Sequence, residues 1–242
     1  MNGVLPVDKP AGPTSHDVVA AARRALGQRR IGHTGTLDPF ATGLLLLCLG
    51  PATRLAEYLT GLDKSYEAVA RLGAATDTLD SDGDVVSESE AWRDLAPEAI
   101  RDAFGAERGT RLQQPPAFSA KKIEGRRAYE LAREGAAVLP DPVEVTVHDL
   151  EVLGVDGPAV RFRLTCSSGT YVRAVARDVG ERLGVGGHLT ELRRTAIGGF
   201  RVEDALPLDR LEDADAVARA LIPPLAALRH MPVAEIDAEG VR

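Results

Sequence analysis

The chain is poor in cysteine, in aromatic residues and in long apolar runs, and each shortage excludes a class of protein. It has 242 residues, of which 2 are cysteines and 4% are aromatic. Cys48 and Cys166 lie in apolar, strand-like surroundings, so we expect two buried thiols and no disulfide. The longest apolar run covers residues 44–49, far fewer than the ~20 residues that a membrane-spanning helix needs. A disulfide-stapled secreted domain and a helical membrane protein are therefore excluded.

Motifs for metals and nucleotides are also missing. The five histidines stand singly and far from the cysteines, so no zinc spacing occurs. Aspartates at positions 80, 82 and 84 surround Gly83 as in a calcium loop, but Ser89 stands where that loop requires a bidentate glutamate. No phosphate-binding loop of the G-x-x-x-x-G-K-[ST] type occurs, and no G-x-G-x-x-G follows a strand. We therefore expect no metal, no nucleotide and no other cofactor.

What is present is the composition of an ordinary globular protein. Hydrophobic residues make up 44% and charged residues 27% of the chain, and no internal repeat or low-complexity tract is visible. Near the start, Pro6, Asp8 and Lys9 interrupt any basic segment followed by an apolar one. We therefore expect no export signal, no membrane association and a cytoplasmic location.

The net charge of −7 argues against a nucleic-acid partner, but the charges are unevenly distributed. Residues 77–107 contain ten acidic residues and two arginines, and residues 203–242 contain nine acidic residues and four arginines. Residues 108–133 and 161–201 each carry a net charge of +5. A polyanion can bind such a local basic face, although from charge alone an ordinary solvated surface is the preferred explanation.

Hydrophobic periodicity predicts strands and helices that interleave irregularly along the chain. Neighbouring strands are close enough in sequence to pair antiparallel, so we expect an α+β fold with a mixed, mostly antiparallel sheet flanked by helices. The predicted strands cover residues 3–7, 44–49, 65–72, 143–147, 160–166, 195–202 and 231–236. The predicted helices cover residues 15–26, with Ser15 as the cap, 53–59, 97–104, 128–133, 171–183 and 214–221.

The most informative stretch is GHTGTLDPFATG at residues 32–43, inside a polar, glycine-rich segment that predicts a loop over residues 29–42. Asp38 precedes Pro39 on a stretch between glycines, which places its carboxylate on a rigid turn. Taken alone, such an aspartate is more often a turn residue that caps a backbone amide. Residues 34–37 resemble the loop of aspartyl-phosphate enzymes, but the nucleophile of that chemistry would stand at Gly32. Phosphoryl transfer therefore lacks its nucleophile here.

Residues 32–43 resemble, almost residue for residue, the catalytic motif of the TruB family of tRNA pseudouridine synthases, which make the pseudouridine of the T-arm. Further blocks resemble the family in the family's own order and span about residues 3–201, so a chance match is untenable. These blocks are GVLPVDKPAG (3–12), KSYE (64–67), RLG (71–73), TDTLD (76–80), QPPAFSAKK (114–122), CSSGTYVR (166–173) and HLTELRR (188–194).

The resemblance implies the pseudouridine-synthase fold and the isomerisation of the T-loop uridine at position 55 of tRNA. This reaction changes no oxidation state, which agrees with the missing cofactor motifs. It needs a carboxylate that attacks or stabilises the ribose or the base, and by resemblance that carboxylate is Asp38. Arg173 matches the family's partner of this aspartate, which a buried nucleophile needs in order to stay ionised. Tyr66 matches the tyrosine that packs on the base and removes a proton from carbon.

A uridine inside a folded arm can react only after it has left the base stack. His33 resembles the family histidine that occupies the vacated place, and Leu192 matches a leucine that lines the pocket. The alternative for Leu192 is an ordinary helix leucine that only packs in the core, and the two interpretations hardly conflict. Asp80 matches a family acid near the pocket, with no role evident from the sequence.

Most of the affinity for RNA is expected from phosphate contacts, with specificity set by the folded shape of the arm. By resemblance, residues 113–140 form a thumb-like insertion that clamps the T-loop, and a solvated loop is the alternative. The candidate contacts are the bases Lys121, Lys122, Arg126, Arg127, Arg193 and Arg194.

We expect residues 1–210 to form the catalytic domain. The family usually ends with a small RNA-binding domain of the PUA type, and the ~30 residues after Leu211 are too few for one. Residues 211–242 are therefore expected to be a truncated or vestigial segment. The expected partner is the T-arm of tRNA, and the expected state is a monomer. The alternatives are a non-catalytic tRNA-folding chaperone on the same fold and, less well supported, a phosphotransferase or hydrolase with an aspartyl intermediate.

Overall fold

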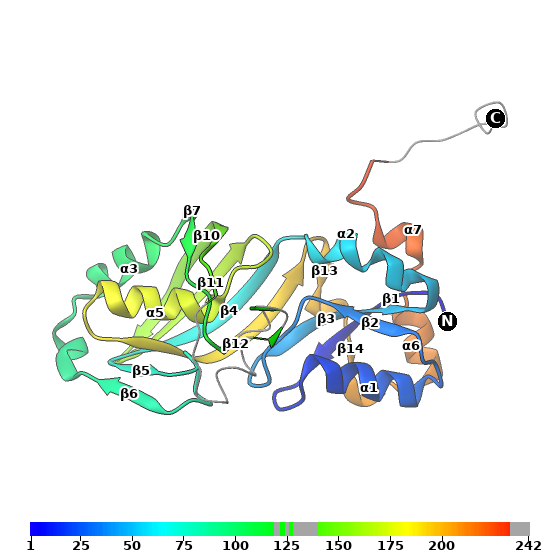
Figure 1. The fold of residues 1–242 in the computed structure, drawn as a ribbon, viewed down its shortest axis with the longest axis horizontal. Helices are drawn as coiled ribbons and strands as arrows, with labels where there is room; N and C mark the ends of the chain where they lie inside the picture. Colours follow the sequence, from blue (N-terminus) through cyan, green and yellow to red (C-terminus); the bar gives the residue numbers. More distant parts are fainter. Residues whose placement is uncertain (119–121, 124–125, 128–139, 233–242) are drawn as a thin grey trace.

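The computed structural model describes residues 1–118, 122–123, 126–127 and 140–232, and its centre is one mixed β-sheet (Figure 1). Among the described strands only the pairs β1 with β14 and β3 with β12 are parallel, which confirms the predicted α+β class and the mostly antiparallel sheet. The strand order is β14 (Leu206–Pro207), β1 (Gly3–Lys9), β3 (Thr42–Leu49), β12 (Gly187–Ile197), β4 (Lys64–Leu72), β11 (Ala159–Cys166), β10 (Val143–Asp156) and β7 (Gly109–Gln113), with β2 (Ile31–Thr34) beside β3 and β13 (Phe200–Arg201) beside β12.

Helices pack at both ends of the sheet and bury three apolar clusters, and Figure 1 shows α3 and α5 over one end with α1 and α6 at the other. The first cluster lies under α3 (Pro97–Gly105) and α5 (Val172–Arg182). The second lies under α1 (Ser15–Ala25) and α6 (Ala214–Ala220), and the third under α2 (Ala56–Thr60) and α7 (Pro224–Ala227). Burial of this apolar surface is the main stabilising contribution to the fold.

Short elements connect these layers. In the described ranges, two small hairpins stand apart from the main sheet, and four 3-10 helices lie in the connections between the longer elements. They are the hairpin of β5 (Ala74–Thr76) with β6 (Val85–Glu88), the hairpin of β8 (Lys122–Ile123) with β9 (Arg126–Arg127), and the helices η1 (Gly50–Leu55), η2 (Glu90–Asp94), η3 (Val202–Asp204) and η4 (Leu208–Arg210).

Several sequence-based predictions of these elements are confirmed. The alternation in β4 buries Tyr66, Ala68 and Ala70, and the helical spacing after Tyr171 produces α5 with its apolar side on the first cluster. Both cysteine thiols are free and buried, as expected. Within the described ranges no helix is long and apolar enough to cross a membrane.

Other predictions are wrong in detail. The last long strand begins at Gly187 and not at residue 195, because residues 187–194 pair along β4, where Leu192 faces Ala68. The expected loop over 29–42 contains β2, which pairs with β3. The first helix is capped by Thr14, in a capping box with Asp17, because Ser15 already lies inside the helix.

Two further predictions cannot be compared in full with the structure. The helix over residues 128–133 lies outside the described residues, and so does most of the strand over 231–236. The domain boundary at residue 210 also stays a prediction. Beyond that boundary, Val217 of α6 and Ala227 of α7 are buried in the same clusters as the strands, so the described part of this segment packs on the sheet.

Candidate active site

Asp38 lies on the seven-residue connection between β2 and β3, and this loop is held by bonds at both ends. The buried Ser15 hydroxyl accepts a hydrogen bond from the Leu37 amide (2.8 Å) and lies 3.1 Å from the Leu37 carbonyl, to which it donates. The Pro39 carbonyl accepts from the Gly12 amide at 2.8 Å, and the Ala41 amide donates to the Asp38 carbonyl at 3.2 Å. The aspartate is therefore presented by a fixed backbone, as the Asp-Pro turn predicts.

The completely buried Lys9 also stabilises this loop, through hydrogen bonds to backbone carbonyls. Its ammonium donates to the carbonyls of Pro10 (2.8 Å), Pro39 (3.2 Å) and Ala41 (2.7 Å). Burial lowers the pKa of Lys9 to about 8, while the carboxylate of Asp38 acts in the opposite direction. A cation at this place both fixes the turn and favours a negative charge on Asp38.

Arg194 fixes the first half of the loop. Its guanidinium donates to the carbonyls of Leu44 (2.7 Å), Gly35 (3.1 Å) and Thr36 (3.4 Å), and the residue is only 1% exposed. These carbonyls occupy the buried donors of Arg194, so its observed role is to support the loop, and its expected contact with RNA stays a prediction. Its backbone also passes close to Gly43, whose φ of +101° requires glycine at this contact.

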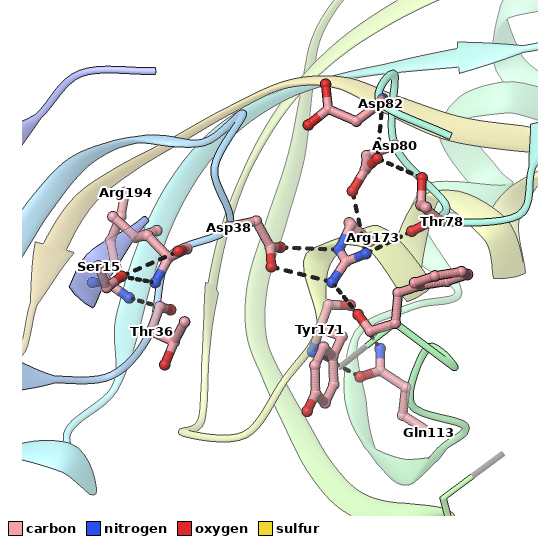
Figure 2. Close-up of polar contacts among 12 residues, drawn as sticks. Ser15, Thr36, Asp38, Thr78, Asp80, Asp82, Gln113, Tyr171, Arg173 and Arg194 are labelled. Atoms are coloured by element: carbon pink, nitrogen blue, oxygen red, sulfur yellow. Dashed lines mark hydrogen bonds and ion pairs between the residues drawn. The ribbon is translucent and has the colours of Figure 1, made fainter. Parts of the chain in front are cut away.

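Arg173 of α5 forms a two-pronged ion pair with Asp38 (Figure 2). The Arg173 Nε atom lies 2.9 Å from Asp38 Oδ2, and Nη2 lies 3.2 Å from Oδ1. The arginine side chain is 5% exposed, whereas 33% of the Asp38 side chain remains open. Burial raises the pKa of the Asp38 carboxyl, and the Arg173 guanidinium counteracts that rise. The pair thus joins a fixed cation to an aspartate whose side chain stays one-third exposed.

Asp80 holds Arg173 from the other side. Its Oδ2 lies 3.2 Å from Arg173 Nη1, and its Oδ1 accepts from the Thr78 hydroxyl (2.5 Å) and the Asp82 amide (3.1 Å). Arg173 Nη1 also donates to the Thr78 carbonyl at 2.6 Å. Between these partners Leu79 has a φ of +64°, a conformation that L-residues rarely adopt. This turn brings the Thr78 carbonyl and the Asp80 carboxylate to the same guanidinium.

A cavity of about 250 Å³ opens beside the ion pair. Asp38 and Arg173 form part of its wall, Tyr66 and Leu192 add apolar surface from β4 and β12, and Lys64 adds a second cation. Burial raises the pKa of the Tyr66 phenol, and the nearby guanidinium of Arg194 acts against it. For Lys64 burial acts in the other direction and lowers the pKa to about 8, because it disfavours the charged ammonium. The cavity therefore combines an apolar surface suited to a flat ring with a carboxylate between cations.

The structure brings together most of the residues predicted for the centre of the site. Asp38, Tyr66, Arg173 and Leu192 all line the cavity, and Asp80 contacts Arg173 from behind. Their catalytic roles stay predictions.

His33 lies on β2 and is not among the residues that line this cavity. Its ring contacts His16 edge to face, with centroids 5.3 Å apart. Burial lowers the pKa of His33 to about 4, so the imidazole is neutral at pH 7. A neutral ring agrees with the expectation that this histidine stacks without a change of charge.

The remaining predicted RNA contacts are described only in part. Arg193 is 42% exposed and forms a two-pronged ion pair with Asp8, at 2.8 and 3.1 Å. Lys121 lies outside the described residues, and Lys122, Arg126 and Arg127 are described only as strand backbone. A role in RNA binding stays a prediction for these residues.

The sequence did not single out three residues that the structure places at the site. Lys9 is the last residue of β1, and Lys64 is the first residue of β4. The ammonium of each lysine donates to backbone carbonyls. Lys64 shares the buried register of Tyr66 and Ala68, so a lysine at an inward position was the available signal. Gln113 bonds the main chain of Tyr171 at the start of α5, and no sequence pattern indicates that contact.

In the part of the chain that the structure describes, no group of three His, Cys, Asp or Glu side chains is arranged to hold a metal ion. The charged groups around the cavity are cations and one carboxylate, and the other polar groups of its lining are hydroxyls such as those of Ser167, Ser168 and Thr170. This donor set fits an anionic or carbonyl-bearing ligand better than a metal.

Two family profiles cover most of the chain. The profile described as TruB family pseudouridylate synthase (N terminal domain) matches residues 23–172, and the profile described as tRNA pseudouridylate synthase B C-terminal domain matches residues 173–231.

Curated relatives named tRNA pseudouridine synthase B align with nearly the whole chain. The protein of Corynebacterium jeikeium is 51% identical over 220 residues, which cover 88% of this chain and 71% of that protein. The protein of Geobacter sulfurreducens is 47% identical over 243 residues, which cover 99% of this chain and 80% of that protein.

Solved structures support the same assignment. A Cbf5-Nop10-Gar1 complex contains a chain that matches with a TM-score of 0.74 and 31% identity, over 95% of this chain and 62% of that one. An H/ACA RNP bound to a substrate RNA containing 2′-deoxyuridine contains a chain that matches with a TM-score of 0.71 and 29% identity, over the same shares. Because a family profile matches well over half of its residues and close relatives align along its length, this chain belongs to the TruB family of pseudouridylate synthases.

Proposed function

We propose that this chain converts the uridine at position 55 in the T-loop of tRNA to pseudouridine, with Asp38 as the nucleophile. The printed name of the relatives, tRNA pseudouridine synthase B, supports tRNA as the substrate. The observation that carries the proposal is the ion pair between Asp38 and Arg173 at the wall of a cavity, with one third of the aspartate side chain open. We infer a cytoplasmic monomer as the working form.

The reaction balances without an added reactant. The bond from ribose C1′ to base N1 breaks, the uracil turns, and a bond from C1′ to C5 forms. C5 loses one proton and N1 gains one, so neither electrons nor groups are gained overall. Asp38 attacks either C1′ or the base, and both routes use the same carboxylate oxygen. Arg173 and Lys9 supply the positive charge that keeps this oxygen ionised in a partly apolar site.

Tyr66 and Leu192 are proposed to hold the detached uracil. Both side chains line the cavity from neighbouring strands and offer apolar surface to a flat ring. We also assign removal of the C5 proton to the Tyr66 phenol. Because burial raises the pKa of this phenol, the assignment depends on Arg194, whose guanidinium favours the phenolate.

Access to the uridine requires base flipping, since the cavity lies inside the protein and the target base is stacked in the folded arm. We propose that the neutral ring of His33 takes the vacated place. We propose that basic side chains contribute phosphate contacts, and the candidates are Lys121, Lys122, Arg126, Arg127 and Arg193.

Release of tritium from tRNA transcript labelled at C5 of uridine tests the proposal. The wild-type chain is expected to release one equivalent per tRNA, with and without a chelator and without any nucleotide. A transcript with cytidine in place of uridine 55 is the matched control and should release none. Equal release from both transcripts would contradict the assigned position, and no release from either would contradict the activity. An isolated T-arm hairpin then shows whether the arm alone is sufficient.

A further inference from the structure

The side chain of Gln113 contacts the backbone that immediately precedes Arg173. Gln113 is the last residue of the edge strand β7, and it is 1% exposed. Its Oε1 accepts a hydrogen bond from the Tyr171 amide at 2.9 Å, and its Nε2 donates to the Tyr171 carbonyl at 3.2 Å. The side-chain amide of Gln113 thus bonds both the main-chain amide and the main-chain carbonyl of Tyr171, as Figure 2 shows in part.

Tyr171 is the N-cap of α5, and Arg173 lies in the first turn of this helix. The cap has no side-chain hydrogen bond to the helix of its own, and the Tyr171 carbonyl also accepts from the Ala174 and Val175 amides at 3.1 and 3.3 Å. Gln113 therefore fixes the residue from which the helix starts. Because the guanidinium of Arg173 extends from the same turn, a shift of the cap moves it relative to Asp38.

The segment after Gln113 contacts the same helix. Arg173 Nη2 donates to the Phe118 carbonyl at 2.9 Å as well as to Asp38, and Arg177 donates to the Gln114 carbonyl at 3.1 Å. The chain thus leaves β7 and passes along α5, bonded to it at three successive points. Gln113 is the first and most buried of these points.

We infer that Gln113 is a positioning residue for the reaction, acting through the cap of α5 on the Arg173 guanidinium and hence on Asp38. The inference rests on the proposed function, because it matters only if Asp38 and Arg173 carry out the chemistry. A misplacement of about 1 Å costs roughly 100-fold in rate where reacting groups must be aligned. Gln113 is not among the residues that line the cavity, and it contacts the lining only through the main chain of Tyr171.

Gln113→Ala removes both hydrogen bonds, and kcat is expected to fall at least tenfold with KM changed less than threefold. The matched control is Thr110→Ala, which removes an exposed hydrogen bond between β7 and Thr146 of β10 without touching α5. The control should keep kcat within twofold of wild type. A kcat within twofold of wild type for Gln113→Ala, in a protein with an unchanged melting curve, would overturn the inference.

Gln113→Glu keeps the shape of the side chain and gives a second readout that does not depend on the stability of the alanine variant. An ionised carboxylate cannot donate to the Tyr171 carbonyl, whereas a protonated one can donate and accept as the amide does. Burial at this position raises the pKa of the introduced carboxyl, because Gln113 is only 1% exposed. The kcat of this variant relative to wild type should therefore rise as the pH falls from 7.5 to 5.5. A ratio that stays flat would contradict the proposed hydrogen bonds.

Arg173→Lys separates this inference from the function on which it rests. If Gln113 acts through Arg173, Gln113→Ala should reduce kcat less than threefold further in the lysine variant, because coupled residues are not additive. A full tenfold further loss would contradict the route through Arg173. Wild-type activity of Arg173→Lys alone would instead contradict the role given to Arg173, and absence of tritium release from the wild-type chain would contradict the proposed function.

Discussion

Asp80 and Arg173 form a buried ion pair, with Asp80 Oδ2 3.2 Å from Arg173 Nη1 and with side chains only 7% and 5% exposed. The pair fixes one edge of the guanidinium, while the other edge faces Asp38. This arrangement gives Asp80 a definite place in the site: it orients the cation that stabilises the proposed nucleophile.

Asp80→Asn should therefore reduce turnover while leaving the overall fold in place. The asparagine keeps the size of the side chain and can still accept from Thr78, but it loses the charge that orients Arg173. We expect kcat to fall about 10- to 100-fold, since misalignment of a catalytic group has an effect of that order. Steady-state tritium release measures it, and the exposed neighbour Asp82, changed to Asn, is the control. Unchanged kcat in the Asp80 variant would show that Arg173 is oriented without it.

Arg173→Lys should shift the acidic limb of the pH–rate profile to higher pH. The proposed nucleophile Asp38 can attack only when ionised; burial raises the pKa of its carboxyl, and the Arg173 guanidinium counteracts that rise. A lysine cannot reproduce the two-pronged contact, so the pKa of Asp38 should rise further and activity should be lost at a higher pH as the pH falls. A limb that stays in place, or moves to lower pH, would contradict the role given to the ion pair.

Arg194→Lys tests whether this buried arginine supports the loop. The change removes donors to the carbonyls of Gly35, Thr36 and Leu44, of which the bond to Leu44 is buried and the other two are partly buried. We expect a loss of roughly 2–4 kcal/mol in the free energy of unfolding, as for buried hydrogen bonds to a charged group. Chemical denaturation measures it, with the exposed Arg201→Lys as control. Equal stability of both variants would argue against this role.

Gly43→Ala should destabilise the protein, because a Cβ atom at this position would lie 2.3 Å from the Arg194 carbonyl oxygen in a backbone with a φ of +101°. We expect at least ~2 kcal/mol in the free energy of unfolding. Gly61→Ala is the matched control, since no atom lies within 4 Å of the added Cβ and its φ is −72°. Thermal denaturation compares the two variants, and equal midpoints would contradict the close contact of β3 with β12.

The sequence predicted the centre of the site better than its support. Asp38, Tyr66 and Arg173 stand in motifs that resemble a known family, so their meeting at one cavity could be expected. Arg194 stands in such a motif too, but its partners are backbone carbonyls about 150 residues earlier in the chain. Every residue has a backbone carbonyl, so a contact with a carbonyl does not require a particular residue type at that position. Neither the burial of Arg194 nor the contact of Gln113 with Tyr171 therefore follows from sequence patterns.

The same limit explains the errors in secondary structure. The β4 strand shows a strict alternation because one face is buried and the other is exposed, and that pattern is visible in the sequence. Residues 187–194 are mostly buried or half-buried, so they show no alternation, and their strand follows only from pairing with β4. For β2, pairing with the apolar β3 likewise outweighs the polar, glycine-rich composition that favours a loop.

The most direct test of the account is the activity of Asp38→Asn on labelled tRNA, measured together with its affinity for the same tRNA. The change keeps the size of the side chain and one acceptor oxygen for Arg173 but removes the nucleophilic carboxylate. We predict that tritium release falls to background while the dissociation constant stays within about threefold of wild type. A chain that acts only as an RNA chaperone would release no tritium even as the wild type, and its binding would not depend on Asp38. Turnover that persists in this variant would contradict the central claim that Asp38 is the nucleophile.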